Sequence, residues 1–437
     1  MINRVKNLVQ KHMRYVRHFV KSQPLTVQYG IDGILALGAV SIAANNNNLF
    51  AQRMGANEFH LSMLQFLPQI ITLFLLIPAG MLTDSLKNKR IMLSAAMFAA
   101  GVFYTFSGLT AFIPVGAIYF LLITLALANV SVTMANLSWQ AYFPEVVEDR
   151  RRNDVLTFRA RMGMIIQLIV PLSVGGILTA ISEHGVVAAH QFFYILAAAM
   201  MISNAFYVRR IKASHPAEPK RISFREMKIA GRRLIGNKRY MVFCLVVLAL
   251  HMGWQLDWTM YFVGQVNYLH MNPFLISLAP VGAMLAQLLT LKFWSRNNAK
   301  QGVELPVVYG MLGLTATPIG MILGVTIGGY IGITVFLIIH FAAHLAFANI
   351  TLNLFQCLLK VVDEEYRSFS ISIYTCMITA SNAVMPVVGV ALYRALGGNQ
   401  QGLIGMFAIM FALRLIAAGL WMLRLWYMKA SENGEES

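Results

Sequence analysis

Negative charge is scarce in this chain. Its 437 residues include 18 aspartates and glutamates against 35 lysines and arginines, and 58% of all residues are hydrophobic. The mean hydropathy is +0.62. A soluble protein of this length cannot hide so much apolar surface, whereas a bundle of helices in lipid does not need to hide it. The composition therefore argues against a soluble protein and predicts an all-α polytopic membrane protein.

Cysteine is scarce as well. The three cysteines, Cys244, Cys357 and Cys376, fall inside apolar stretches at no metal-like spacing, so we expect neither a disulfide nor a bound metal. The first 24 residues are basic and precede the first apolar stretch, so no cleavable signal peptide is expected. The net charge of +17 would suggest nucleic acid as the partner of a soluble protein. Here basic loops at a membrane surface explain that charge, and we expect no nucleic-acid partner.

Twelve stretches are long and apolar enough to cross a bilayer as helices. If the N-terminus is cytoplasmic, every lysine and arginine except Arg53, Arg394 and Arg414 falls in or beside a cytoplasmic segment. Such a bias predicts the orientation, with both termini cytoplasmic and the chain in the plasma membrane. The expected spans are 25–49, 59–83, 89–111, 113–143, 155–182, 188–208, 240–267, 272–294, 304–326, 329–360, 366–394 and 401–427.

The chain also repeats itself after about half its length. The segment 146–152 recurs as 361–367, and Pro171 in the following span recurs as Pro386. A parallel repeat of six spans is a known arrangement in secondary transporters. The expected divisions are a basic amphipathic segment (1–24), a six-helix bundle (25–208), a central loop (209–239), a second six-helix bundle (240–427) and a tail (428–437), which looks disordered from residue 432.

A short charged segment, residues 80–90, joins the second and third spans. An acid such as Asp84 in such a loop can accept hydrogen bonds from free N–H groups at a helix N-terminus. The segment resembles the motif Gly-x-Leu-Ala-Asp-Arg-x-Gly-Arg-Lys, which follows the second helix of the major facilitator superfamily of secondary transporters. Ser85, Lys87 and Asn88 depart from that motif. The matching residues are Gly80, Leu82, Asp84 and Lys89, and Arg90 completes the expected gate motif.

The resemblance implies two pseudo-symmetric six-helix bundles that alternate access to a midplane site, with the gate motif latching the cytoplasmic side. It also implies that the first, fourth, seventh and tenth helices line a central cavity. We expect a monomer in the lipid bilayer that moves a small-molecule substrate. We expect no cofactor, the driving force being a proton or other ion gradient.

Only two of the carboxylates, Asp32 and Asp257, lie well inside an expected span. A charge buried in lipid is costly unless it is paired or hydrated, so both are candidates for proton coupling. Asp32 lies about 10 Å deep by helical rise, and Arg159 and Arg161 lie at a similar depth. A structural ion pair is therefore an equally good interpretation of Asp32.

Asp257 has no obvious basic partner in the sequence. By helical rise it lies about 15 Å deep, and three histidines, His251, His340 and His344, lie at comparable depths on the seventh and tenth helices. A carboxylate and imidazoles in a hydrated cavity can exchange protons near neutral pH. The alternative is that each histidine only hydrogen-bonds a neighbouring backbone group.

Amide and aromatic side chains favour the same four helices. Some of the amides serve interhelical hydrogen bonding, and the rest are candidates for contact with a substrate. The candidate cavity residues are Asn45, Asn129, Asn136, Gln140, Trp254, Trp258, Tyr261, Asn349 and Asn353.

These features favour a transporter over an enzyme. The leading hypothesis is proton-coupled export of a small amphipathic or cationic compound by an efflux antiporter, and the alternative is uptake of a nutrient or peptide fragment. Two family patterns are missing: a basic residue in the fourth span, and the antiporter sequence Gly-Pro-x-x-Gly-Gly around Pro171. A membrane transferase would need a catalytic cluster near a membrane face. The only acidic clusters there, around Glu148 and Glu364, occupy repeat-equivalent loops, which favours a structural role.

Overall fold

The computed structural model describes residues 24–86, 88–211, 231–362 and 367–435. These residues are helical, with no strand among them, as the composition predicts. Eleven of the described helical segments are long and apolar enough to cross a membrane. A further helix of 28 residues occupies the place of the second expected span. Most of the two basic amphipathic segments falls outside the described residues.

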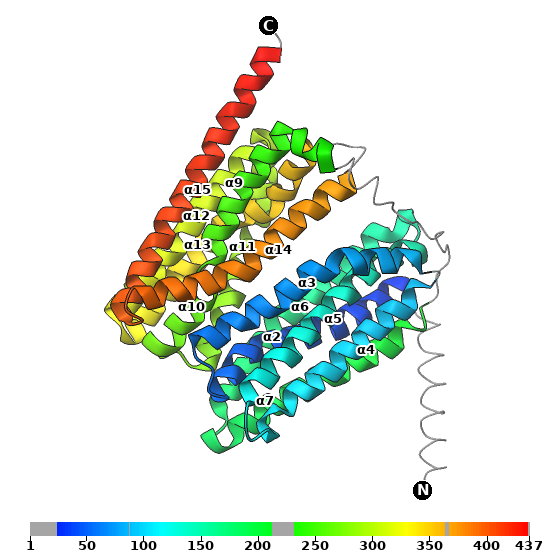
Figure 1. Cartoon of the computed structure of the whole chain (residues 1–437), viewed down its shortest axis with the longest axis vertical. Coiled ribbons are helices and arrows are strands. Elements are labelled where there is room, and N and C mark those ends of the chain that lie inside the picture. The colour runs from blue at the N-terminus through cyan, green and yellow to red at the C-terminus, as the bar shows by residue number, and fades with distance from the viewer. Residues whose placement is uncertain (1–23, 87, 212–230, 363–366, 436–437) are drawn as a thin grey trace. The chain divides into compact units, whose positions relative to one another are not determined.

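The helices follow the expected spans closely (Figure 1). In the first half they are α2 (Leu25–Arg53), α3 (Glu58–Ser85), α4 (Lys89–Gly108), the short 3₁₀ turn η1 (Thr110–Phe112), α5 (Ala117–Val146), α6 (Asp149–Ala180) and α7 (Glu183–Val208). In the second half they are α9 (Lys238–Gln255), α10 (Trp258–Val263), the π-helical turn η2 (Gly264–Tyr268), α11 (Pro273–Gln301), α12 (Glu304–Ile327), α13 (Gly329–Val361), α14 (Arg367–Ala395) and α15 (Gln400–Glu435).

The described chain divides into two compact units, and each unit is made of two separate stretches of the sequence. Residues 24–54 and 74–211 form the first unit, while residues 55–73 join those from 231 onward in the second. The first half of α3 thus belongs to the second unit, whereas the sequence places the whole helix in the first bundle. An ion pair between Glu58 Oε2 and Arg394 Nη2, 3.2 Å apart, holds this half of α3 in the second unit.

Each unit repeats the same helix pairings. In the first unit α2 packs on α6 and α7, and α4 packs on α5 and α7. In the second unit α9 packs on α14 and α15, and α12 packs on α13 and α15. The helices that correspond by order therefore make corresponding contacts, which confirms the pseudo-symmetric bundles predicted from the repeat.

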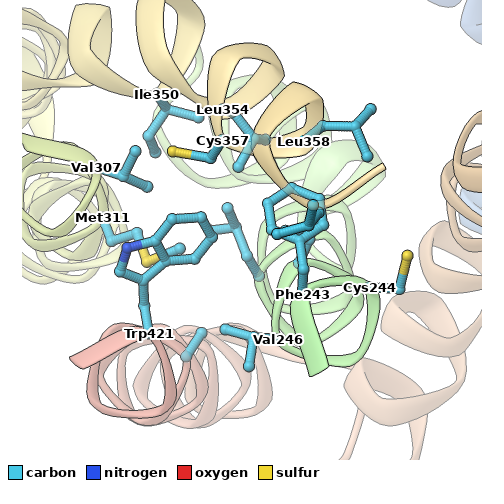
Figure 2. Packing of buried hydrophobic residues seen from close by; sticks show 14 of the residues in the cluster. Phe243, Cys244, Val246, Val307, Met311, Ile350, Leu354, Cys357, Leu358 and Trp421 are labelled. Carbon is cyan, nitrogen blue, oxygen red and sulfur yellow. The ribbon is translucent and has the colours of Figure 1, made fainter. Parts of the chain in front are cut away.

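The core of the second unit lies between α9, α12, α13 and α15. Figure 2 shows Trp421, Phe243 and Ile350 pointing into it from three of these helices. The rings of Phe243 and Trp421 meet edge to face, with centroids 6.0 Å apart. Arg424 of α15 is buried against the same rings and donates to Glu304 Oε2 at 3.3 Å. Such dense packing is expected to hold α15 in place.

The structure corrects three boundaries. Helix α15 continues to Glu435, beyond the expected end at 427 and into the tail predicted to be disordered. Residues 428–433 contain neither proline nor glycine, and Gly434 falls only in the last turn. Helix α3 extends to Ser85 and α4 begins at Lys89, so the connection is shorter than the charged segment suggested. The span predicted over 240–267 is interrupted after Gln255.

Helix α14 approaches that interruption through a glycine. A Cβ atom built on Gly389 would lie 1.9 Å from the backbone oxygen of Leu256, the residue that follows α9. Backbone cannot yield as a flexible side chain can, so only glycine fits here without moving α14.

Gly389→Ala should therefore lower the thermal unfolding temperature of the purified protein, since overpacking a closed site costs about 1–3 kcal/mol. Gly419→Ala on α15 is the matched control, because a Cβ atom added there would have nothing within 4 Å. That variant should unfold at or slightly above the temperature of the unmodified protein. Equal melting temperatures for the two variants would contradict the close approach.

Candidate functional site

The clearest candidate site surrounds the interruption between α9 and α10. Leu256 and Asp257 form a turn there with right-handed helical backbone angles, and α10 restarts with Tyr261 N–H donating to the carbonyl of Asp257 at 2.8 Å. A helix end leaves its last carbonyl groups without partners inside the helix, which is costly in a membrane. Interrupted helices that line a binding site are a recurring feature of transporters.

Arg414 of α15 supplies the missing donors. Its Nε donates to the Gly253 carbonyl at 3.1 Å, and its Nη2 donates to the Trp254 carbonyl at 3.3 Å and to Asp257 Oδ2 at 2.6 Å. Its Nη1 donates to two acceptors on α12, the Leu314 carbonyl at 3.0 Å and Thr317 Oγ1 at 2.5 Å. All five guanidinium N–H groups thus have an acceptor.

The expectation that Asp257 lacks a basic partner is wrong. Asp257 is fully buried, and its partner Arg414 is 2% exposed and lies 157 positions further along the chain. Sequence separation hid the pair, but one signal was present. Within the second half, Asp257 and Arg414 are the acid and the base deepest inside the expected spans, and opposite charges in lipid pair with each other.

Histidines and aromatic rings lie on both sides of the interruption. On α9, Gln255 Nε2 and His251 Nδ1 are 2.9 Å apart, and the His251 ring lies 5.7 Å from that of Trp254. On α13, the rings of His340 and His344 are 4.4 Å apart.

Further ring contacts join the two helices into one group. Trp254 lies 5.0 Å from Phe347 and 6.0 Å from Trp258, Tyr261 lies 6.0 Å from His340, and His344 lies 5.5 Å from Phe347. We call this group the polar–aromatic cluster. Its members are His251, Trp254, Gln255, Trp258, Tyr261, His340, His344 and Phe347.

Several polar atoms of the cluster are buried without a partner. His251 Nε2, Gln255 Oε1 and His340 Nδ1 make no hydrogen bond to any described residue. Buried polar atoms in proteins are normally hydrogen-bonded to protein or ordered water. Unpaired atoms gathered beside aromatic rings therefore indicate a place where water or a solute completes the hydrogen bonding.

The two candidate amides of α13 follow this cluster in sequence and are both fully buried. Asn353 Oδ1 accepts from Asn298 Nδ2 of α11 at 3.1 Å, which joins two helices. Asn349 Nδ2 donates to the Ala346 carbonyl of its own helix at 3.2 Å. Asn353 thus has a structural contact, while Asn349 Oδ1 has no partner among the described residues.

In the first unit, Asp32 is fully buried and both of its oxygens are occupied. Oδ2 accepts from Arg159 Nε and from Trp139 Nε1, each at 3.1 Å, and Oδ1 accepts from Asn204 Nδ2 at 3.0 Å. The Arg159 guanidinium lies 4.2 Å from the centre of the Trp139 ring. The structure thus shows the ion pair with Arg159, whereas Arg161 is exposed. The contacts join α2, α5, α6 and α7, which favours a structural interpretation of Asp32.

The asparagine run at the end of α2 also joins helices. Asn46 is fully buried and makes two hydrogen bonds with His190 of α7, one to the ring and one to the carbonyl at 3.0 Å. The hydroxyl of Tyr194 donates to Asn47 Oδ1 at 2.8 Å. Asn45 instead donates to the Ser41 carbonyl of its own helix at 2.8 Å.

The other amide candidates of the first unit make few contacts with neighbouring helices. Asn129 donates to the Leu125 carbonyl within α5 at 2.9 Å, and Asn136 and Gln140 are exposed.

The gate motif is only partly described. Gly80, Leu82 and Asp84 lie in the last turns of α3, and their side chains fall outside the described part of the structure. Lys89 is buried and pairs with Glu145 of α5, with 2.7 Å between Nζ and Oε1. Arg90 donates to the Ile211 carbonyl at 3.3 Å. These two basic residues therefore fasten the start of α4 to its neighbours.

Within the described residues, no three histidine, cysteine, aspartate or glutamate side chains are grouped so as to hold a metal ion. The two histidines one turn apart on α13 pack ring against ring.

The described residues contain twelve membrane-length helical segments, arranged in two units with repeated helix pairings. One segment is interrupted beside a buried polar group. Together these features define a polytopic transporter. The chain belongs to the Major Facilitator Superfamily, whose family model matches residues 33–359. It is accordingly a multi-pass membrane protein and a secondary transporter that works by alternating access, rather than an enzyme.

Solved structures share this fold at low sequence identity. A mutant of the nucleoside transporter NupG is 11% identical, with 92% of this chain and 100% of that chain covered and a TM-score of 0.74. A bacterial homologue of the iron transporter ferroportin, in an inward-facing state, is 13% identical, with 92% and 99% covered and a TM-score of 0.70. A bacterial homologue of the human lysosomal transporter Spinster is 14% identical, with 94% and 97% covered and a TM-score of 0.60. No curated protein matches the chain in sequence.

The asparagine run allows a direct test of structural against solute-binding amides. Asn46→Leu should destabilise the protein by about 1–3 kcal/mol, because it leaves the buried His190 groups without partners. Asn45→Leu, one position away, removes only a bond within its own helix and should cost much less. Thermal unfolding of the purified variants measures both. A larger loss from Asn45→Leu would show that the cross-helix contacts have been misassigned.

Proposed function

We propose that this transporter binds a small, neutral, amphipathic solute at the polar–aromatic cluster of the second unit and exports it in exchange for protons. The observation that carries the proposal is the set of unpaired buried atoms, His251 Nε2, Gln255 Oε1 and His340 Nδ1, beside aromatic rings. Transporter sites commonly combine apolar walls with a few convergent polar groups.

The charge of the solute follows from the ion pairs. A cationic compound was expected because two carboxylates lie inside the spans, but Asp32 pairs with Arg159 and Asp257 pairs with Arg414. The charge of each carboxylate is thus balanced by an arginine, although Asp257 Oδ1 makes no hydrogen bond to any described residue. The groups that remain are imidazoles, an amide and indole rings, which suit a neutral solute with one flat apolar face and a few polar atoms.

The solved relatives carry chemically different cargoes, so their fold does not choose a solute. Among the named ones, a nucleoside has a flat ring with hydrogen-bonding groups, which suits the cluster, but its sugar makes it more polar than the amphipathic solute proposed here. A metal ion fits less well, because the described residues hold no suitable group of ligands.

In this proposal the imidazoles, and not the two buried carboxylates, couple transport to protons. An imidazole can take up and release a proton, and the cluster contains three of them. The rings of His340 and His344 touch, and His344 Nδ1 lies 2.7 Å from the His340 carbonyl. A proton gained at one ring alters the hydrogen bonding that the solute needs, which links the two movements.

The direction and location follow from simpler arguments. An amphipathic solute enters the cell through lipid unaided, so a carrier that consumes a gradient is useful chiefly for removing it. The bias of basic residues supports cytoplasmic termini in a plasma-membrane protein. Each unit has its own complete core, which is compatible with a monomer.

The test is flux in proteoliposomes across a panel of neutral ring compounds and organic cations, with and without a pH gradient. Neutral compounds should be transported, and an inward proton gradient should drive them out. Gln255→Leu should raise the half-saturation concentration about tenfold, as expected for one lost hydrogen bond to a ligand. Gln287→Leu on α11 is the matched control, since the Gln287 side chain bonds to Ala283 and Thr351, which lie outside the cluster.

Three results would contradict the proposal. Transport restricted to cations would mean that a buried carboxylate, and not the cluster, recognises the solute. An equal shift of half-saturation in Gln255→Leu and Gln287→Leu would remove the assignment to the cluster. Gradient-driven accumulation of a neutral solute in the opposite direction would replace export by uptake, the alternative drawn from the sequence.

A further inference from the structure

The interruption of the seventh span divides the polar–aromatic cluster. His251, Trp254 and Gln255 precede it on α9, while Trp258 and Tyr261 follow it on α10. The conformation at Leu256 and Asp257 therefore sets how the two groups face each other. Any residue that fixes this conformation also fixes the shape of the proposed site.

Arg414 is placed to fix it. Its guanidinium contacts α9 through the Gly253 and Trp254 carbonyls, and it contacts the interruption itself through Asp257. The same group is anchored on α12 by Leu314 and Thr317. Gly253 lies close to Arg414, since a Cβ built there would be in ordinary van der Waals contact with Arg414 Cγ, at 3.7 Å.

The far end of the α10 segment is held separately. The hydroxyls of Tyr268 and Tyr393 are 2.6 Å apart, which ties the end of η2 to α14. A Cβ on Gly264 would lie 2.7 Å from Met321 Sδ, so η2 also packs closely on α12. The two ends of this segment are thus held by different contacts, and at the near end Arg414 holds Asp257.

We propose that Arg414 is a positioning residue of the transporter: it contacts no solute, and it holds α9 and α10 in the arrangement that the solute site requires. This proposal rests on the proposed site in the second unit. It predicts that the solute site depends on the planar geometry of the Arg414 guanidinium as well as on its positive charge. Arginine offers five donors in a rigid plane, whereas lysine offers three from a single atom and cannot reach all five acceptors.

The chain provides a matched control on the same helix. Arg424, like Arg414, is 2% exposed, but it contacts Glu304, Phe243 and Trp421 away from the interruption. Arg414→Lys and Arg424→Lys therefore make the same chemical change at equal burial. Both should lower the melting temperature, which is the effect that a purely structural role produces.

Two further measurements separate positioning from stability. In Arg414→Lys, backbone amides of residues 253–261 should exchange hydrogen faster than in the unmodified protein, and the half-saturation concentration should rise about tenfold. Arg424→Lys should change neither. Thr317→Val is a milder second variant that keeps Arg414 and removes one acceptor, so it should shift both measurements in the same direction by less.

The hydrogen-exchange measurement needs no solute, so it tests Arg414 even if the proposed solute class is wrong. Failure of the unmodified protein to transport any compound of the panel would count against the proposed function alone. Unchanged exchange at residues 253–261 in both Arg414→Lys and Thr317→Val would overturn the positioning role. Equal changes in exchange or half-saturation in Arg424→Lys would overturn it too, because the effect would then be general destabilisation.

Discussion

A charge inside a membrane bundle must have a partner, and this requirement governs both units of the protein. Asp32 lies against Arg159 in the first unit, and Asp257 lies against Arg414 in the second. Removing one member of a buried pair leaves an uncompensated charge, which is far more costly than losing both. Each pair also joins helices that are distant in sequence, so the same interaction that neutralises the charge fixes the packing. The surrounding aromatic cores then close around positions that the ion pairs have set.

The two ion pairs, Asp32–Arg159 and Asp257–Arg414, stabilise different local structures. Around Asp32, every described oxygen contact joins intact helices, through Trp139, Arg159 and Asn204. Around Asp257, the arginine completes an interrupted helix, and the unpaired polar atoms of the cluster lie close by on α9 and α13. An interruption permits polar groups at membrane depth only where their hydrogen bonds are met from elsewhere. The second unit therefore contains both the device that stabilises the interruption and the groups left free to bind a solute.

Much of the fold was predictable, because hydropathy, basic loops and the repeat around Val146 and Val361 are local or periodic signals. The interruption at Leu256 was not, since the nearby Gly253 is of a type common in intact membrane helices. Its stabilisation comes from Arg414, which lies 157 positions beyond Asp257. The partner of Asp32 was predictable in part, because helical depth placed both Arg159 and Arg161 near it, and the structure selects Arg159. Six members of the polar–aromatic cluster were recognised from the sequence as histidines and aromatic residues on the seventh and tenth helices, but Gln255 and Phe347 were not. Their contacts depend on side-chain packing between α9, α10 and α13, which depth does not determine.

The central claim is that Arg414 neutralises Asp257, and thermal unfolding of three variants tests it most directly. Arg414→Gln should be strongly destabilised, by about 3–5 kcal/mol, because it leaves a buried carboxylate without its partner. Adding Asp257→Asn to that variant should raise the melting temperature again, although not fully, since the carbonyls of Gly253 and Trp254 still lack their donor. Asp257→Asn alone supplies the third corner of the cycle. A double variant that melts at or below the temperature of Arg414→Gln would contradict the account.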